Sequence, residues 1–176
     1  MQYTNPVISG FYPDPSVFRV GVAYYLVSSS FEYFPSIPIF KSEDLMNWEI
    51  IGHVIDEKNA IKLREGNPNR TGMYAPTIRY HKGMFYVVCT NVAYGDEDDG
   101  NFVVRSHSPY GPWSIPSFID LPGIDPSLFF DDDGSVYYTG THGSIYICRL
   151  DEHTLQPTEA RKDIWSGTGG CAPEGP

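Results

Sequence analysis

Short runs of apolar, aromatic and β-branched residues recur along the whole chain, each bounded by Gly, Pro, Asn, Asp or Ser. Runs of this length and composition predict β-strands, and no stretch shows the 3.6-residue period of an amphipathic helix. The sequence therefore predicts an all-β protein. The predicted strands cover residues 16–20, 23–28, 37–42, 49–54, 77–80, 84–90, 101–106, 118–119, 127–130, 136–140 and 144–150, with an outermost strand within 155–165.

Four prolines, at positions 15, 76, 126 and 173, head these strand groups with a period of about 50 residues, which is typical of propeller blades. Four short strands per unit predict a β-propeller whose proline-headed strands are innermost. The predicted blades cover residues 1–55, 74–120 and 121–167, and a fourth starts at 168–176. Because propellers have about four to eight blades, we expect the N-terminal part of a propeller domain, with the remainder absent from this sequence.

Acidic residues stand at these repeated prolines. When the prolines are aligned, Asp14 and Asp125 share the column before proline, and Glu174 falls two columns later. Because residues two apart in a strand face the same side, we expect the three acids to project from one face at a similar level. Pro15 is expected to hold Asp14 in an extended conformation, because proline restricts the residue before it.

Three carboxyl groups at the mouth of a channel indicate hydrolysis of a glycosidic bond. One acid must protonate the leaving oxygen, while another activates water or attacks the sugar. Neighbouring negative charge raises the proton affinity of one member of such a group. The alternative is that Asp14 and Asp125 only accept hydrogen bonds from backbone amides where strands begin. The repetition of three acids in register favours a site.

The overall charge limits the choice of partner. A formal net charge of -10 over 176 residues argues against nucleic acid or an anionic membrane surface. No apolar run is long enough to span a membrane, and residues 1–6 do not resemble a signal peptide, so we expect a cytoplasmic protein. The three cysteines are scattered, and the acidic run at 96–100 lacks a full calcium-loop pattern. We therefore predict neither metal nor cofactor.

Several short motifs together carry a resemblance to a known family. They are residues 5–7 (NPV), 13–16 (PDPS), 28–35 (SSSFEYFP), 39–40 (IF), 44–48 (DLMNW), 74–79 (YAPTIR), 123–127 (GIDPS) and 172–176 (APEGP). With these motifs the whole chain resembles the family 43 glycoside hydrolases, which are five-bladed propellers, and most closely their β-xylosidase group. The resemblance implies that this is part of a catalytic domain.

The resemblance also implies an inverting mechanism and assigns the roles of the acids. Asp14 would be the general base that deprotonates water, and Glu174 the general acid that protonates the departing oxygen. Asp125 would stay ionised, orient Glu174 and raise its pKa. The carboxyl groups of an inverting pair stand about 6.5–9.5 Å apart, which we expect for Asp14 and Glu174. Phe31, Tyr74 and Ala75 would bind substrate, with Tyr74 standing where the family often has tryptophan.

The leading hypothesis is a xylan 1,4-β-xylosidase that releases xylose from the non-reducing ends of β-1,4-xylo-oligosaccharides. An α-L-arabinofuranosidase or a bifunctional enzyme acting on arabinose-bearing substrates is the near alternative, because both sugars present similar hydroxyls. From another class, a non-catalytic sugar-binding propeller is disfavoured by the presence of all three acids. The family's channel arginine and late-blade histidine should lie beyond residue 176, so activity of this length of chain stays open. Homo-oligomerisation also stays open.

Overall fold

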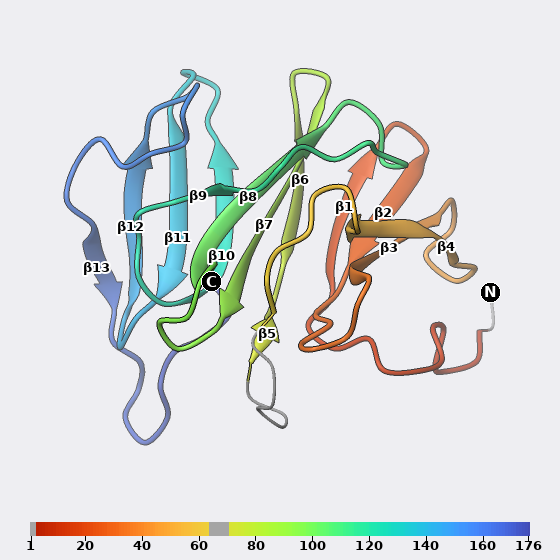
Figure 1. Ribbon diagram of the computed structural model, residues 1–176, viewed down its shortest axis with the longest axis horizontal. Coiled ribbons are helices and arrows are strands. Elements are labelled where there is room, and N and C mark those ends of the chain that lie inside the picture. Colours follow the sequence, from red (N-terminus) through yellow and green to blue (C-terminus); the bar gives the residue numbers. More distant parts are fainter. Residues whose placement is uncertain (1–2, 64–70) are drawn as a thin grey trace.

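The computed structural model describes residues 3–63 and 71–176, and all regular elements in these ranges are β-strands. They form three antiparallel sheets that lie side by side (Figure 1). The predicted all-β class is confirmed. In the described part of the chain there is no helix long and apolar enough to cross a membrane.

Each sheet is built mainly from strands that follow one another in the sequence. The first contains β1 (Ser16–Val20), β2 (Ala23–Val27), β3 (Ser36–Ser42) and β4 (Glu49–Ile55). The second contains β5 (Gly72–Met73), β6 (Thr77–His81), β7 (Met84–Val92), β8 (Gly100–Ser106) and β9 (Ser117–Phe118). The third contains β10 (Ile124–Phe130), β11 (Val136–Thr141), β12 (Ile145–Leu150) and β13 (Lys162–Trp165).

The predicted strands are confirmed, with small changes at their ends. The outermost strand of the third sheet is shorter than the 155–165 interval, because residues 151–156 form a turn. In that turn the Asp151 carboxylate accepts hydrogen bonds from the backbone N–H groups of His153 and Thr154. β5 was not predicted. It pairs with the far end of β7, beyond the part that pairs with β6.

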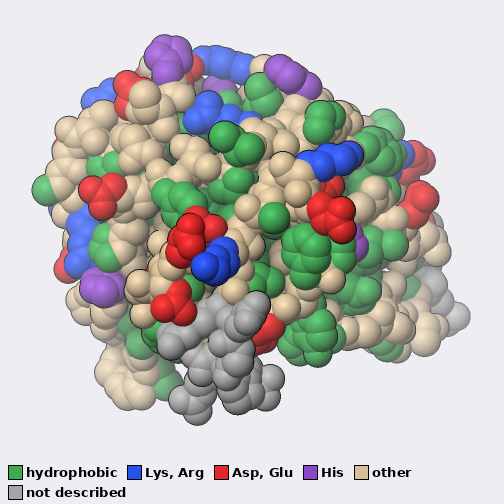
Figure 2. Space-filling view, in the orientation of Figure 1, with side chains coloured by type: hydrophobic (Ala, Val, Ile, Leu, Met, Phe, Trp, Pro, Cys, Tyr) green, Lys and Arg blue, Asp and Glu red, His purple; other side chains and the backbone are tan. Residues whose placement is uncertain are grey.

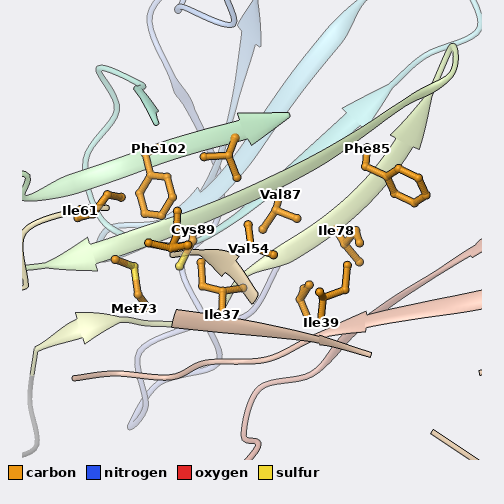
Figure 3. Packing of buried hydrophobic residues seen from close by; sticks show 13 residues of the cluster. Ile37, Ile39, Val54, Ile61, Met73, Ile78, Phe85, Val87, Cys89 and Phe102 are labelled. Carbon is orange, nitrogen blue, oxygen red and sulfur yellow. The ribbon is translucent and has the colours of Figure 1, made fainter. Parts of the chain in front are cut away.

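Two apolar cores separate the three sheets. Successive side chains of β7 point to opposite cores. Val87 and Cys89 belong to the core shared with the first sheet, whereas Val88 belongs to the core shared with the third. Phe102 and Val103 on β8 divide in the same way. Figure 3 shows the first core, in which side chains of the first two sheets interdigitate. The middle sheet is therefore apolar on both faces.

The three proline-headed strands lie next to one another. β6 contacts both β1 and β10, and Figure 1 shows it between them. Side chains join these strands, since the Ile78 N–H donates to Ser16 Oγ (3.3 Å) and Thr77 Oγ1 donates to the Pro126 carbonyl (2.8 Å). This is the arrangement expected of inner strands in successive blades. The exact limits of the blades stay a prediction.

Candidate active site

Asp14 lies directly before β1, between two prolines. Its φ is 53°, in the left-handed region, so the expectation that Pro15 holds Asp14 extended was wrong. Aspartate tolerates this region better than most residues, and two hydrogen bonds from Ser29, two residues after β2, hold the segment. Ser29 Oγ donates to Asp14 Oδ2 (2.5 Å), and the Ser29 N–H donates to the Pro13 carbonyl (3.0 Å).

Asp125 lies in a β-bulge of β10. Ile124 pairs with Thr141 and Ser127 pairs with Thr139, so β10 contains one residue more than β11 over this interval. The φ of Asp125 is 56°, again left-handed. A bulge re-aims the side chain at its position. The simple two-residue alternation assumed from the sequence therefore does not describe β10 at Asp125.

Glu174 is placed by contacts on both sides of it. Before it, Pro173 is buried and its carbonyl accepts a hydrogen bond from Thr141 Oγ1 at the end of β11 (2.5 Å). After it, the Gly175 N–H donates to Asp125 Oδ2 (2.9 Å). The side chain of Glu174 is exposed. Asp125 thus holds the backbone beside Glu174.

All three acids line one open pocket of about 860 Å³. The predicted substrate-binding residues Phe31, Tyr74 and Ala75 line the same pocket. The structure therefore brings together every residue that the sequence assigned to the site. Figure 2 shows that acidic side chains lie in separate spots on that face of the molecule.

The electrostatics of the pocket link the three carboxyl groups. Burial raises the pKa of Asp125 above its ordinary value, and the hydrogen bond from the Gly175 N–H opposes this effect. The negative charges of Glu174 and Asp14 each raise the pKa of Asp125 further. The half-buried Asp125 therefore senses the charge of both other acids.

An aromatic wall borders the carboxyl groups. Phe31 has a φ of 47°, and its backbone N–H and carbonyl both pair with Met73 (2.9 and 3.0 Å). Because Tyr74 follows Met73, the rings of Phe31 and Tyr74 meet edge to face, with centroids 5.4 Å apart. Gly72 allows this approach, since a Cβ there would overlap the Phe31 carbonyl. Aromatic rings that line a pocket in this way offer apolar faces to a sugar.

The sequence reasoning missed two groups of the site. Arg79 lines the pocket, although it lies five residues beyond Tyr74. Its position on β6, two residues after Thr77, was a usable signal, because both side chains leave the same face of the strand. Ser29, the partner of Asp14, had no such signal, because the contact spans 15 residues.

Within residues 3–63 and 71–176, no three His, Cys, Asp or Glu side chains are grouped so that they could hold an ion. In the acidic run at 96–100, the Asp99 carboxylate accepts hydrogen bonds from the N–H groups of Ala93 and Gly95 (2.7 and 2.6 Å). Asp99 therefore closes a turn.

The three sheets have the arrangement of successive blades in part of a β-propeller, and one pocket groups three carboxyl groups beside two aromatic rings. The family model "Glycosyl hydrolases family 43" matches residues 3–176. The chain belongs to this family. The match confirms the resemblance that the sequence motifs carry.

Solved structures of the family agree with the predicted propeller class. The structure described as Bacteroides ovatus Xyloglucan PUL GH43B superposes with a TM-score of 0.91, at 42% identity over 99% of this chain and 34% of that chain. A xylan beta-1,4-xylosidase from Bacillus halodurans C-125 gives a TM-score of 0.90, at 34% identity over 99% of this chain and 36% of that one.

A curated relative is the xylosidase/arabinosidase of Butyrivibrio fibrisolvens, which is 44% identical over 98% of this chain and 35% of its own length. Another is the non-reducing end alpha-L-arabinofuranosidase BoGH43B of Bacteroides ovatus, 43% identical over 99% of this chain and 33% of its own length. The chain spans about a third of the length of the curated relatives it matches.

Proposed function

We propose that the protein is an inverting glycoside hydrolase that releases xylose from the non-reducing ends of β-1,4-xylo-oligosaccharides. The observation that carries this proposal is the single pocket lined by Asp14, Asp125 and Glu174 beside the rings of Phe31 and Tyr74. Carboxyl groups supply the proton transfers, and the rings supply an apolar face for the sugar.

In the proposed reaction, Asp14 is the general base. Its Oδ2 is held by Ser29 Oγ, which leaves Oδ1 to accept the proton of the attacking water. Glu174, on an exposed segment at the pocket, donates its proton to the departing oxygen. The water attacks the anomeric carbon as the glycosidic bond breaks, so the sugar leaves with inverted configuration.

Asp125 acts on the acid through the backbone and through charge. Its bond to the Gly175 N–H fixes the residue next to Glu174. Its negative charge, when ionised, disfavours a second negative charge on a neighbouring carboxyl group, which keeps a proton available for transfer. Asp125 is therefore proposed as the group that orients the acid and tunes its proton affinity.

Kinetics on the full-length protein would test the two main roles. Glu174→Gln should lose about 10²–10⁴-fold in rate on xylobiose. The loss should be much smaller on dinitrophenyl xyloside, whose leaving group needs no proton. Asp14→Asn should lose a similar factor on both substrates, because activation of water is needed in each case. Asp163→Asn, on the exposed strand β13, is the matched control and should keep the parent rate.

The stereochemical outcome tests inversion directly. Proton NMR of the first turnover of a β-xyloside should show α-xylose before mutarotation. Initial release of β-xylose would indicate a retaining enzyme, whose carboxyl groups stand about 5 Å apart, and would contradict the assignment of Asp14 as a base.

Substrate preference is tested by comparing nitrophenyl β-xyloside with nitrophenyl α-L-arabinofuranoside. We expect a higher kcat/KM on the xyloside. A higher value on the arabinoside would reject the proposed sugar while keeping the hydrolase. Parent protein that binds xylo-oligosaccharides but cleaves neither substrate would reject the hydrolase.

A further inference from the structure

Two side chains of β6 hold β10 directly after Asp125. Thr77 Oγ1 donates to the Pro126 carbonyl (2.8 Å). Arg79 Nη2 donates to Ser127 Oγ (2.8 Å), and its Nε donates to the Leu128 carbonyl (3.0 Å). Three consecutive residues after Asp125 are thus bonded to a strand of another sheet.

The strand pairing of β10 is weakest at this place. The bulge interrupts its register with β11 between Ile124 and Ser127, and Pro126 has no N–H with which to join a ladder. Pro126 and Ser127 are nevertheless buried. The bonds from β6 therefore supply the constraint that the β10–β11 ladder lacks here.

The conformation of Asp125 needs such a constraint. A left-handed φ of 56° in a residue that precedes proline is disfavoured. Strained backbone of this kind persists only where its surroundings fix it. The three residues that follow Asp125 are held by β6, and the Asp125 carboxylate accepts a hydrogen bond from the Gly175 N–H.

Arg79 holds β10 through the geometry of its hydrogen bonds and not through an ion pair, because all its acceptors are uncharged oxygens. Besides Ser127 and Leu128, it donates from Nη1 to the Ile78 carbonyl (2.8 Å). Among the ion pairs found in residues 3–63 and 71–176, none joins Arg79 to a carboxylate. Burial lowers the pKa of Arg79, so the guanidinium depends on these acceptors in place of water.

We propose that Thr77 and Arg79 are positioning residues, which clamp the β10 bulge so that Asp125 can fix the segment carrying Glu174. The inference rests on the proposed function, because it assigns both residues to the same catalytic site. It does not make either of them an acid, a base or a sugar ligand.

Three variants of the full-length protein test the clamp. Thr77→Val keeps the shape of threonine but removes the donor to Pro126, and Arg79→Lys keeps the charge but cannot reach Ser127 and Leu128 together. Each should lower kcat on xylobiose by about 10- to 100-fold, because small displacements of catalytic groups have effects of this size. KM should stay within about twofold of the parent. Thr77→Ser, which retains the hydroxyl, should restore kcat to within about twofold.

Two matched controls carry the same substitutions away from the pocket. Arg105 joins β8 of the second sheet to the turn after β12, through bonds from Nη1 and Nη2 to the His153 carbonyl at an exposed site. Thr158 Oγ1 donates to the Arg149 carbonyl. Arg105→Lys and Thr158→Val should keep the parent kcat. Parent-like kcat in both Thr77→Val and Arg79→Lys would overturn the clamp.

Crystal structures of the Thr77→Val and Arg79→Lys variants separate this inference from the proposed function. They should show Asp125 leaving the left-handed region or losing its bond to the Gly175 N–H. If both variants keep the φ and the bond of the parent, the clamp is refuted whatever the kinetics. If the parent protein has no hydrolase activity, the proposed function fails, and these structures still decide whether β6 positions Asp125.

Discussion

Gly123 offers a sharp test of how the third sheet supports the site. It lies two residues before Asp125, has a φ of +91°, and packs against the backbone of Thr141 at the end of β11. An added Cβ would overlap the Thr141 carbonyl oxygen and lie 2.8 Å from its carbon. Backbone cannot move aside as a flexible side chain can, so Gly123→Ala must displace one of the two segments.

The expected cost has two parts. A left-handed backbone costs a residue with a Cβ about 1–2 kcal/mol, and overpacking a closed site costs about 1–3 kcal/mol. Gly123→Ala should therefore destabilise the protein by about 2–5 kcal/mol. Gly134 in the β10–β11 turn is a matched control, because its φ is +87° and its missing Cβ would meet nothing within 4 Å. Gly134→Ala should cost only about 1–2 kcal/mol.

The same substitution should also reduce activity. Thr141 Oγ1 holds the Pro173 carbonyl, one residue before Glu174, so a displaced Thr141 carries the proposed acid with it. We expect kcat of Gly123→Ala to fall about 10-fold or more, with Gly134→Ala close to the parent. Urea unfolding and steady-state kinetics of the full-length variants measure both effects. Equal loss of stability in the two variants, with kcat unchanged, would refute the reasoning.

Three further predictions concern charge and hydrogen bonding. Burial and the neighbouring acids raise the pKa of Asp125 in the folded protein. Protonated Asp125 therefore stabilises the folded protein fully below the ordinary pKa of 3.8, and this stabilisation is lost as the pH rises through the raised pKa of the folded protein. Asp125→Asn should remove this pH dependence of urea unfolding and lower kcat; an unchanged pH dependence would contradict it. Asn101, which is 2% exposed, donates to the Leu121 and Gly123 carbonyls and accepts from Thr90. Asn101→Leu should lower the free energy of unfolding by about 3 kcal/mol or more, and a loss below about 1 kcal/mol would argue against this network. The exposed pair of Lys82 and Glu152 should contribute little, so Lys82→Ala should change the free energy of unfolding by less than about 1 kcal/mol.

Most of the fold could be predicted because strands carry their own signals. The continuous apolar run that contains Val87 and Val88 indicates a strand buried on both faces, and successive residues of that strand point to opposite cores. Turn sequences such as Asp133-Gly134 mark where one strand ends and the next begins. β5 escaped prediction because two residues, Gly72 and Met73, have no period. Its existence depends on the partners Val92 and Asn91 on β7 and on the bridge to Phe31.

The three acids that share the pocket could be predicted, but their conformation and some of their neighbours could not. Proline spacing identified Asp14, Asp125 and Glu174, which line one pocket. The rule that proline favours an extended residue before it failed at both aspartates. The hydrogen bonds that the two carboxylates accept come from Ser29, 15 residues away, and Gly175, 50 residues away. No local pattern contains such partners.

The polar residues that follow the prolines explain how a site built on separate sheets keeps its geometry. Within residues 3–63 and 71–176, no strand of one sheet pairs with a strand of another, although the backbone of Ser30 and Phe31 bonds to Met73. Apolar packing between the sheets is non-directional, so it does not by itself fix the height of one strand against the next. Hydrogen bonds through Ser16, Thr77 and Ser127 join neighbouring inner strands at the level of the pocket. Because these bonds are directional, they fix the height of one strand against the next. We therefore expect the small polar residue after each of the first three prolines to help hold the acids in position without touching a substrate.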